Sequence, residues 1–156
     1  AAPRSVSDGP RLMTDWVDFY ILPTQDPKDR RVTACKLVEK AYRQGLTLYI
    51  KTQDEEESRV LDDLLWTFRQ GSFVPHEMAG SSNKDVPIVI GHSEMVDDER
   101  DVLVNLSEIV PKGYERFRRV AELVDQDEAT KKAGRERYKT YQLQGLEIKT
   151  HALEKA

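Results

Sequence analysis

The sequence predicts one α/β domain, built on a mostly parallel sheet with helices on both faces. Short apolar or β-branched stretches alternate along the chain with longer segments that have helical periodicity, which is typical of strand–helix–strand units. The chain has 156 residues, of which 38% are apolar and 33% charged, enough for one hydrophobic core and a well-solvated surface. No internal repeat or low-complexity tract interrupts this pattern.

The first quarter of the chain predicts a strand and a helix. Residues 16–22 are aromatic and β-branched, which favours a strand. Asp26 followed by Pro27 is typical of a helix start, because aspartate caps free backbone N–H groups and proline fits the first helical position. Apolar residues then recur at helical spacing until Gly45.

A second strand and helix follow. Residues 46–50 predict the strand, and Thr52 with Glu55 resembles a capping box at the helix start. Acidic residues 54–57 suit the first turn of a helix, where they interact favourably with its dipole. One face of this helix is apolar, with Leu61, Leu64, Leu65 and Phe68.

The second half contains shorter elements. Three apolar stretches predict strands, at residues 73–74, 87–90 and 102–106. Apolar residues at helical spacing predict a third helix, with Phe117, Val120, Ala121 and Val124 on one face. Residues 125–143 predict a fourth helix, and residues 146–148 a last short strand.

The expected boundaries are a tag remnant or disordered leader at residues 1–12, the α/β domain at 13–150 and a tail at 151–156. A native extension ordered by packing is the alternative for residues 1–12. No apolar run reaches the roughly 18 residues of a membrane span. Cys35 is the only cysteine, which is typical of a cytoplasmic protein.

The search for a catalytic, cofactor or metal site finds no complete motif. Residues 23–27, after the first strand, contain no glycine, whereas a phosphate-binding loop needs glycines for close backbone approach. His76-Glu77 resembles the start of a zinc-protease helix, but Gly80 replaces the second histidine. Cys35 falls on the apolar face of the first helix, where an inert buried thiol is favoured over a nucleophile. We therefore expect no cofactor and no metal.

The last predicted helix carries a cationic stripe around a tyrosine. Lys131, Arg135, Tyr138 and Gln142 fall on one narrow stripe, with Lys139 at its edge. Residues 111–149 hold ten Lys and Arg against seven Asp and Glu, whereas the whole chain has a net charge of −4. The stripe is either a pocket for an acidic and aromatic ligand or a solvated basic face on which Tyr138 lies flat.

A second feature is the segment 71–80, with the sequence GSFVPHEMAG. It places Phe73 and Val74 beside a proline, at a predicted transition from strand to loop. Phe73 either fills the core or belongs to a surface patch for a partner.

Three phrases resemble the chi subunit of the bacterial DNA polymerase III holoenzyme, an accessory subunit of the clamp loader. They are VDFYIL at residues 17–22, LLWTFRQGSFVPHEMAG at 64–80 and RERYKTY at 135–141. Together the similar segments extend from about residue 16 to residue 148.

The resemblance implies a Rossmann-like domain without a nucleotide-binding loop, and an adaptor rather than an enzyme. It implies that the psi subunit of the clamp loader binds Phe73 and its neighbour Val74. It also implies that the acidic, phenylalanine-terminated C-terminal tail of single-stranded-DNA-binding protein (SSB) binds a second site, formed by Lys131, Arg135, Tyr138, Lys139 and Trp66. DNA would then be contacted only indirectly. The alternative is an enzyme acting on nucleic acid or nucleotides through an unrecognised site.

Overall fold

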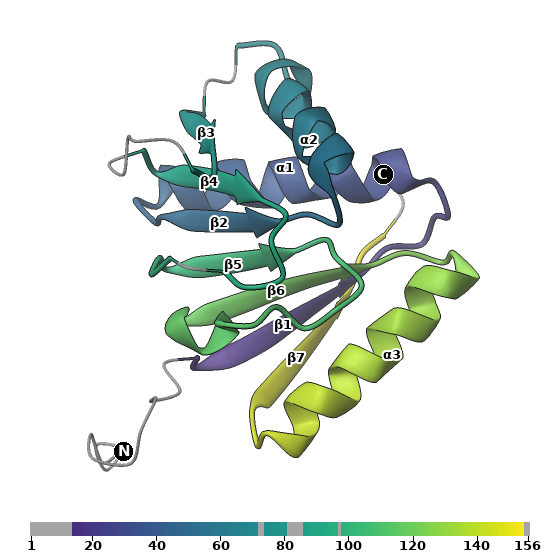
Figure 1. Ribbon diagram of the computed structural model, residues 1–156. Coiled ribbons are helices and arrows are strands. Elements are labelled where there is room, and N and C mark those ends of the chain that lie inside the picture. Colours follow the sequence, from purple (N-terminus) through teal and green to yellow (C-terminus); the bar gives the residue numbers. More distant parts are fainter. Residues whose placement is uncertain (1–13, 72–73, 81–85, 97, 155–156) are drawn as a thin grey trace, which may run out of the picture.

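The computed structural model describes residues 14–71, 74–80, 86–96 and 98–154. It contains a seven-stranded sheet in the order β3-β4-β2-β5-β6-β1-β7, in which every neighbouring pair is parallel (Figure 1). The elements in chain order are β1 (Trp16–Ile21), α1 (Pro27–Arg43), β2 (Leu48–Lys51), α2 (Glu55–Thr67), β3 (His76–Met78), β4 (Ile88–Gly91), β5 (Val102–Asn105), the 3₁₀ helix η1 (Tyr114–Arg116), β6 (Arg119–Val124), α3 (Glu128–Leu143) and β7 (Glu147–Ala152).

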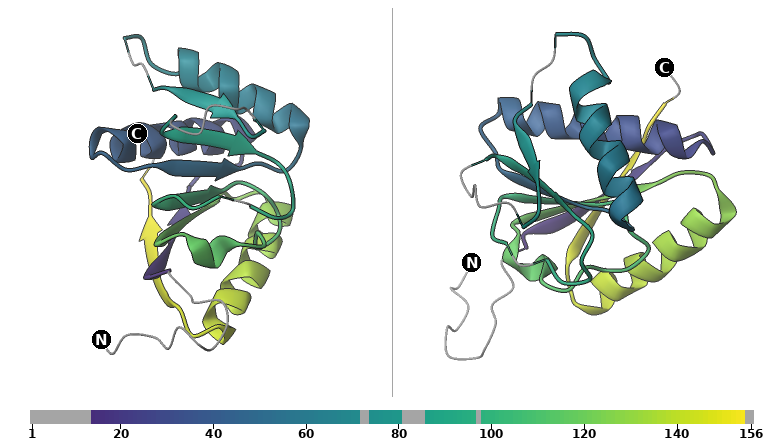
Figure 2. Two further views of the ribbon diagram at one scale, coloured as in Figure 1. Left: turned by 60° about the vertical axis from the view of Figure 1, so that its left-hand side comes forward. Right: turned by 45° about the horizontal axis from the view of Figure 1, so that its top comes forward.

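Helices cover both faces of the sheet, which confirms the predicted Rossmann-like α/β architecture (Figure 2). On one face, Leu48 and Ile50 of β2 pack in the cluster that α1 and α2 close. Tyr49 points to the other face, into the cluster that contains Tyr141 of α3. This alternation along β2 is the two-residue period of a strand whose faces are both buried.

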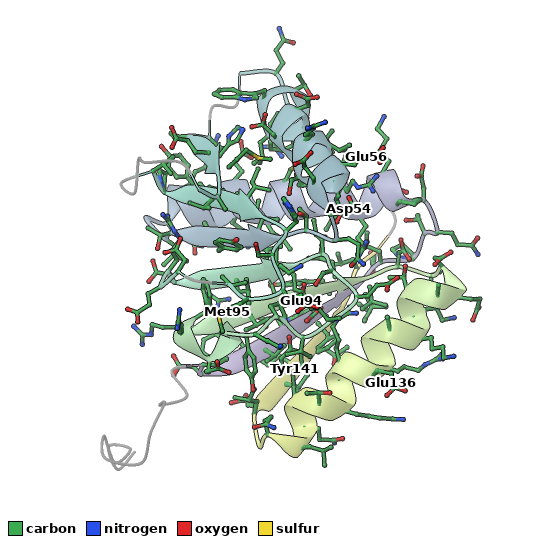
Figure 3. All side chains as sticks on the ribbon, viewed as in Figure 1. Asp54, Glu56, Glu94, Met95, Glu136 and Tyr141 are labelled. Carbon is green, nitrogen blue, oxygen red and sulfur yellow. The ribbon has the colours of Figure 1, made fainter. Side chains whose placement is uncertain are left out.

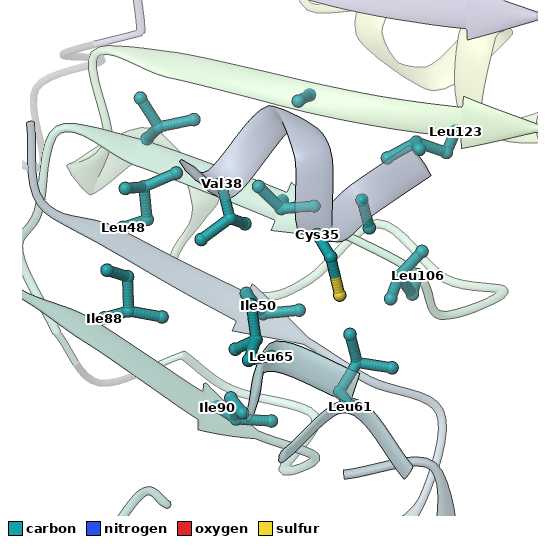
Figure 4. Packing of buried hydrophobic residues seen from close by; sticks show 14 of the residues in the cluster. Cys35, Val38, Leu48, Ile50, Leu61, Leu65, Ile88, Ile90, Leu106 and Leu123 are labelled. Atoms are coloured by element: carbon teal, nitrogen blue, oxygen red, sulfur yellow. The ribbon is translucent and has the colours of Figure 1, made fainter. Parts of the chain in front are cut away.

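The predicted buried thiol of Cys35 is confirmed. Figure 4 shows its sulfur directed into the space between Ile50, Leu61 and Leu106. Burial raises the pKa of the Cys35 thiol to about 12, so the nucleophilic thiolate is disfavoured.

The helix starts agree with the sequence at α1 and differ at α2. Asp26 caps α1 by accepting the Lys28 backbone N–H at 3.0 Å. At α2 the predicted capping box was wrong by two residues: Asp54, and not Thr52, is the cap, and its Oδ1 accepts the Glu57 N–H at 2.8 Å.

The third predicted helix was wrong, because residues 119–124 form strand β6. Every residue from Val120 to Val124 is buried between the two helical layers. A strand covered on both faces has apolar residues at consecutive positions, and such a run also satisfies helical spacing. The helix expected over 125–143 begins at Glu128, with Asp127 as its cap.

Two other segments differ from expectation. The strand expected at 73–74 begins only at His76, and Phe73 lies outside the described residues. The last strand, expected at 146–148, is β7 and extends from Glu147 to Ala152. None of the helices in the described part of the chain is long and apolar enough to span a membrane.

Candidate functional site

A cavity of about 580 Å³ opens between α3 and the strands β1 and β6. Four of the residues predicted from the sequence line it together: Lys131, Arg135, Tyr138 and Lys139. The remaining lining residues are Phe19, Ile21, Val124, Gln126, Gly134 and Gln142. The cationic stripe of α3 therefore borders a cavity.

The floor of this cavity is apolar. Phe19 and Ile21 of β1 and Val124 of β6 point to the α3 face of the sheet. The Phe19 ring lies 5.3 Å from the Tyr138 ring, tilted by 56°, while Tyr138 keeps 36% of its surface exposed. An aromatic group that enters the cavity can therefore contact two rings.

Gly134 sets the distance between α3 and the floor. A Cβ at this position would lie only 2.8 Å from Cγ2 of Val124, so the helix approaches β6 as closely as a glycine allows. The spacing of floor and rim thus depends on a residue that the sequence pattern did not single out.

The rim carries three cationic side chains, which differ in whether a nearby carboxylate pairs with them. Lys131 lies 3.6 Å from Glu128, and Lys139 lies 3.8 Å from Glu136, both within one helical turn. Arg135 is exposed and has no ion pair among the residues that the structure describes. Its guanidinium can therefore bind an incoming carboxylate through two parallel hydrogen bonds.

A buried polar network fixes the other side of α3. Glu122 of β6 is fully buried and accepts hydrogen bonds from Arg137 Nε at 2.8 Å, Tyr141 Oη at 2.7 Å and Asn105 Nδ2 at 2.8 Å. Burial raises the pKa of Tyr141 well above its ordinary value, and the Glu122 carboxylate adds to this shift. Figure 3 shows Tyr141 between α3 and the sheet and Glu136 on the outer side of the helix. Sequence reasoning missed this network, although Glu122 and Asn105 were visible as polar residues inside apolar runs.

The other predicted site residues lie elsewhere. Trp66 does not line the cavity: it is 48% exposed on α2, across the sheet from α3, with its ring 4.6 Å from that of His76. Val74 is 1% exposed and packs in the cluster that contains Leu61 and Leu65. Phe73 lies outside the described residues.

The carboxyl ends of the parallel strands are where open α/β sheets usually bind nucleotides. A cavity of about 440 Å³ lies here, and its lining holds six carboxylates against three arginines, so its net negative charge disfavours phosphate. Among the described residues, no group of three His, Cys, Asp or Glu side chains could hold a metal ion.

Comparison with known proteins identifies the family. The model of the family "DNA polymerase III chi subunit, HolC" matches residues 13–149. The chain is 39% identical over 137 residues to the DNA polymerase III subunit chi of Pseudomonas aeruginosa, covering 88% of this chain and 96% of the relative. It is 31% identical over 142 residues to the subunit chi of Haemophilus influenzae, covering 88% and 97%. It is 30% identical over 138 residues to that of Escherichia coli, covering 85% and 94%. The chain therefore belongs to the DNA polymerase III chi subunit family.

Proposed function

We propose that this chain is a non-catalytic adaptor that connects the replicative polymerase to SSB by holding the acidic C-terminal tail of SSB in the α3 cavity. The observation that supports this most directly is the convergence of Lys131, Arg135, Tyr138 and Lys139 on one apolar-floored cavity. The sequence had grouped these residues by helical spacing and family resemblance alone.

The chemistry of the cavity suits such a tail. The terminal phenyl ring packs on Phe19 and Tyr138, where aromatic contacts stabilise it beyond simple burial. Arg135 holds the terminal carboxylate through a forked, charge-assisted hydrogen bond. Lys131 and Lys139 attract the aspartates that precede the phenylalanine, and their long contacts to glutamates are easily exchanged.

Fluorescence anisotropy with a labelled tail peptide tests this proposal. Arg135→Ala weakens binding by about 2 kcal/mol or more, because it leaves a carboxylate unpaired. Lys132→Ala is the matched control: this cation is exposed on the same helix but does not line the cavity. Binding also weakens as salt rises, since exposed charges are screened over about 8–10 Å at physiological ionic strength. An equal loss of peptide affinity in Arg135→Ala and Lys132→Ala, or an affinity that does not change with salt, would rule out the α3 cavity as the tail site.

Trp66 is the one residue of the expected tail site that does not line the α3 cavity. It lies on α2, on the opposite face of the sheet from the cavity. A tail held only by the α3 cavity binds Trp66→Ala as well as the unmodified protein. A loss with this variant would instead assign Trp66 to the tail site.

We further propose that the psi subunit of the clamp loader binds the segment that contains Phe73 and Val74. Burial of Val74 indicates that it supports this segment from the core side, so Phe73 is the residue to test. Phe73→Ala abolishes capture of purified psi, leaves binding of the tail peptide unchanged, and keeps the free energy of unfolding within about 1 kcal/mol. A loss of roughly 3–5 kcal/mol in the unfolding measurement would place Phe73 in the core instead.

A further inference from the structure

One part of the sheet has no helical cover. Helix α2 lies over β3 and β4 and α1 lies over β2 and β6, and Figure 2 shows β1 and β7 uncovered on that face within the described chain. We call this surface the β7 face; its residues are Trp16, Asp18, Tyr20, Arg119, Lys149 and His151. They belong to aligned positions of β6, β1 and β7, so their side chains share one side of the sheet.

The β7 face combines aromatic rings with cations. The Arg119 guanidinium lies 4.8 Å and the Lys149 ammonium 3.9 Å from the centroid of the Trp16 ring. Tyr20 stacks on His151 with ring centroids 4.8 Å apart and an angle of 19°. Trp16 and Tyr20 are four residues apart on one strand, which places them about 13 Å apart along the sheet.

The buried carboxylate of this surface, that of Asp18, already has hydrogen-bond partners on both oxygens. Asp18, with a side chain only 5% exposed, accepts from Trp16 Nε1 at 2.9 Å and from Arg119 Nη2 at 3.4 Å. His151 Nε2 lies 2.8 Å from its other oxygen. Asp18 thus holds the edge of the indole, the guanidinium and the imidazole in place, and its charge is neutralised by Arg119.

A groove of about 460 Å³ between α1 and the sheet joins the β7 face, since Asp18, Tyr20 and Arg119 line both. It adds the exposed ammonium groups of Lys36 and Lys40 above an apolar floor. Within the described residues, no ion pair engages Lys36, Lys40 or Lys149.

Glu147 lies at the end of β7, beside Trp16, and is the exposed carboxylate closest in register to these rings. The cations of the β7 face and groove outnumber its carboxylates, so the surface as a whole favours an anion.

We propose that the β7 face and the adjoining groove bind single-stranded DNA directly, in contrast to the indirect contact that the family resemblance implies. The rings of Trp16 and Tyr20 lie in line on an open part of the sheet, beside lysines that form no ion pair among the described residues. This arrangement suits a DNA strand whose bases stack on the rings while its phosphates contact the ammonium groups. Lys149 leaves the Trp16 ring to meet a phosphate and thereby frees a ring surface for a base. An acidic peptide fits less well, because Arg119 already donates Nη2 to Asp18 and its Nε is buried, which leaves less of the guanidinium for a carboxylate. Membership of a DNA polymerase subunit family favours DNA over RNA.

Tryptophan fluorescence gives a direct test, because the chain contains only two tryptophans. Trp66→Phe leaves Trp16 as the sole reporter, and a base that stacks on its ring quenches its emission. The probe is an oligothymidylate of about ten nucleotides, titrated at low salt. Saturable quenching is the expected result. Its absence overturns the proposal.

Charge variants in this Trp66→Phe background locate the contact. Lys149→Glu weakens oligothymidylate binding on the order of tenfold, since it replaces an attraction by a repulsion. Lys132→Glu makes the same charge change on α3, across the sheet, and leaves binding within about twofold. Equal losses in both variants indicate an unspecific charge effect and overturn the site.

The salt dependence of oligothymidylate affinity reports how many phosphates the protein contacts. If Lys36, Lys40 and Lys149 each contact one phosphate, the logarithm of the affinity falls with the logarithm of the salt concentration at a slope of about −2. Lys149→Gln then reduces the magnitude of this slope by about 0.7.

Competition with other ligands tests the identity of the occupant. An acidic SSB-tail peptide that displaces the oligonucleotide from Trp16 makes this a peptide site, and markedly tighter oligouridylate binding makes it an RNA site; either result overturns the proposal. Arg135→Ala changes the α3 cavity and not the β7 face, so it leaves the Trp16 quenching unchanged. The tail proposal and the DNA proposal can therefore fail independently.

Discussion

Two arginines only two residues apart on α3 have opposite environments. Arg135 is exposed on the rim of the cavity, with no ion pair among the described residues, whereas the Arg137 side chain is 3% exposed and donates to Glu122 at 2.8 Å. A separation of two positions turns the side chain by about 200° around a helix. The same charged group therefore serves recognition at one position and stability at the other.

The rest of α3 follows this division. Lys131, Tyr138 and Gln142 share the side of Arg135, while Gly134 and Tyr141 share the side of Arg137. Gly134 belongs to both groups, because its missing side chain lets the helix approach β6 and it also lines the cavity. We therefore expect substitutions on the two sides to separate binding from stability, with Gly134 affecting both.

The largest effect is expected for Arg137→Ala. It removes the cation beside the fully buried Glu122 carboxylate and should lower the free energy of unfolding by about 3–5 kcal/mol, measured by urea denaturation. Adding Glu122→Gln removes the uncompensated charge and should recover part of this loss. A loss below about 1 kcal/mol for Arg137→Ala alone would contradict the structural role assigned to the network.

Gly134→Ala should have an intermediate effect. The new Cβ meets Val124 at 2.8 and 3.3 Å, and overpacking of this kind typically costs about 1–3 kcal/mol, which outweighs a helix-propensity gain of up to about 1 kcal/mol. We expect a net loss of stability and weaker tail binding, since the helix must move away from the cavity floor. Combining it with Val124→Ala should reduce the penalty of the glycine change. Independent, additive penalties would show that the close approach to Val124 does not matter.

The buried side of α3 also predicts a dependence on alkaline pH. Because burial raises the pKa of Tyr141 in the folded state, its contribution to stability is complete below the unfolded pKa of about 10 and is lost as pH rises toward the folded value. Between about pH 9 and pH 11 the unmodified protein should therefore lose more stability than Tyr141→Phe. Denaturation curves at both pH values measure this difference. Parallel losses in the two proteins would show that Tyr141 ionises as readily in the folded state as in the unfolded one.

The sequence predicted what depends on local pattern. It located the parallel α/β fold, the start of α1 at Asp26 and the cationic stripe of α3, because capping chemistry and helical spacing act over a few residues. The sequence-based prediction failed where burial by segments distant in the chain determines the local structure. Residues 119–124 form a strand because helices pack on both sides of it, and Glu122 is tolerated there only because Arg137, Tyr141 and Asn105 surround it. The cavity floor was also unpredictable, since Phe19 and Val124 are brought together beneath α3 by the long-range pairing of β1 with β6.

The smallest effect on stability is expected for Arg135→Ala, the counterpart of the first substitution. Arg135 is exposed, and alanine has a slightly better helix propensity, so the free energy of unfolding should change by less than about 0.5 kcal/mol. The same variant should lose most of its affinity for the tail peptide, whereas the stability loss of Arg137→Ala should be unaffected by adding Arg135→Ala. Urea denaturation of both single variants and the double variant measures this independence. A coupling above about 0.5 kcal/mol would show that recognition and stability share one network on α3, and that the two arginines do not act as separate units.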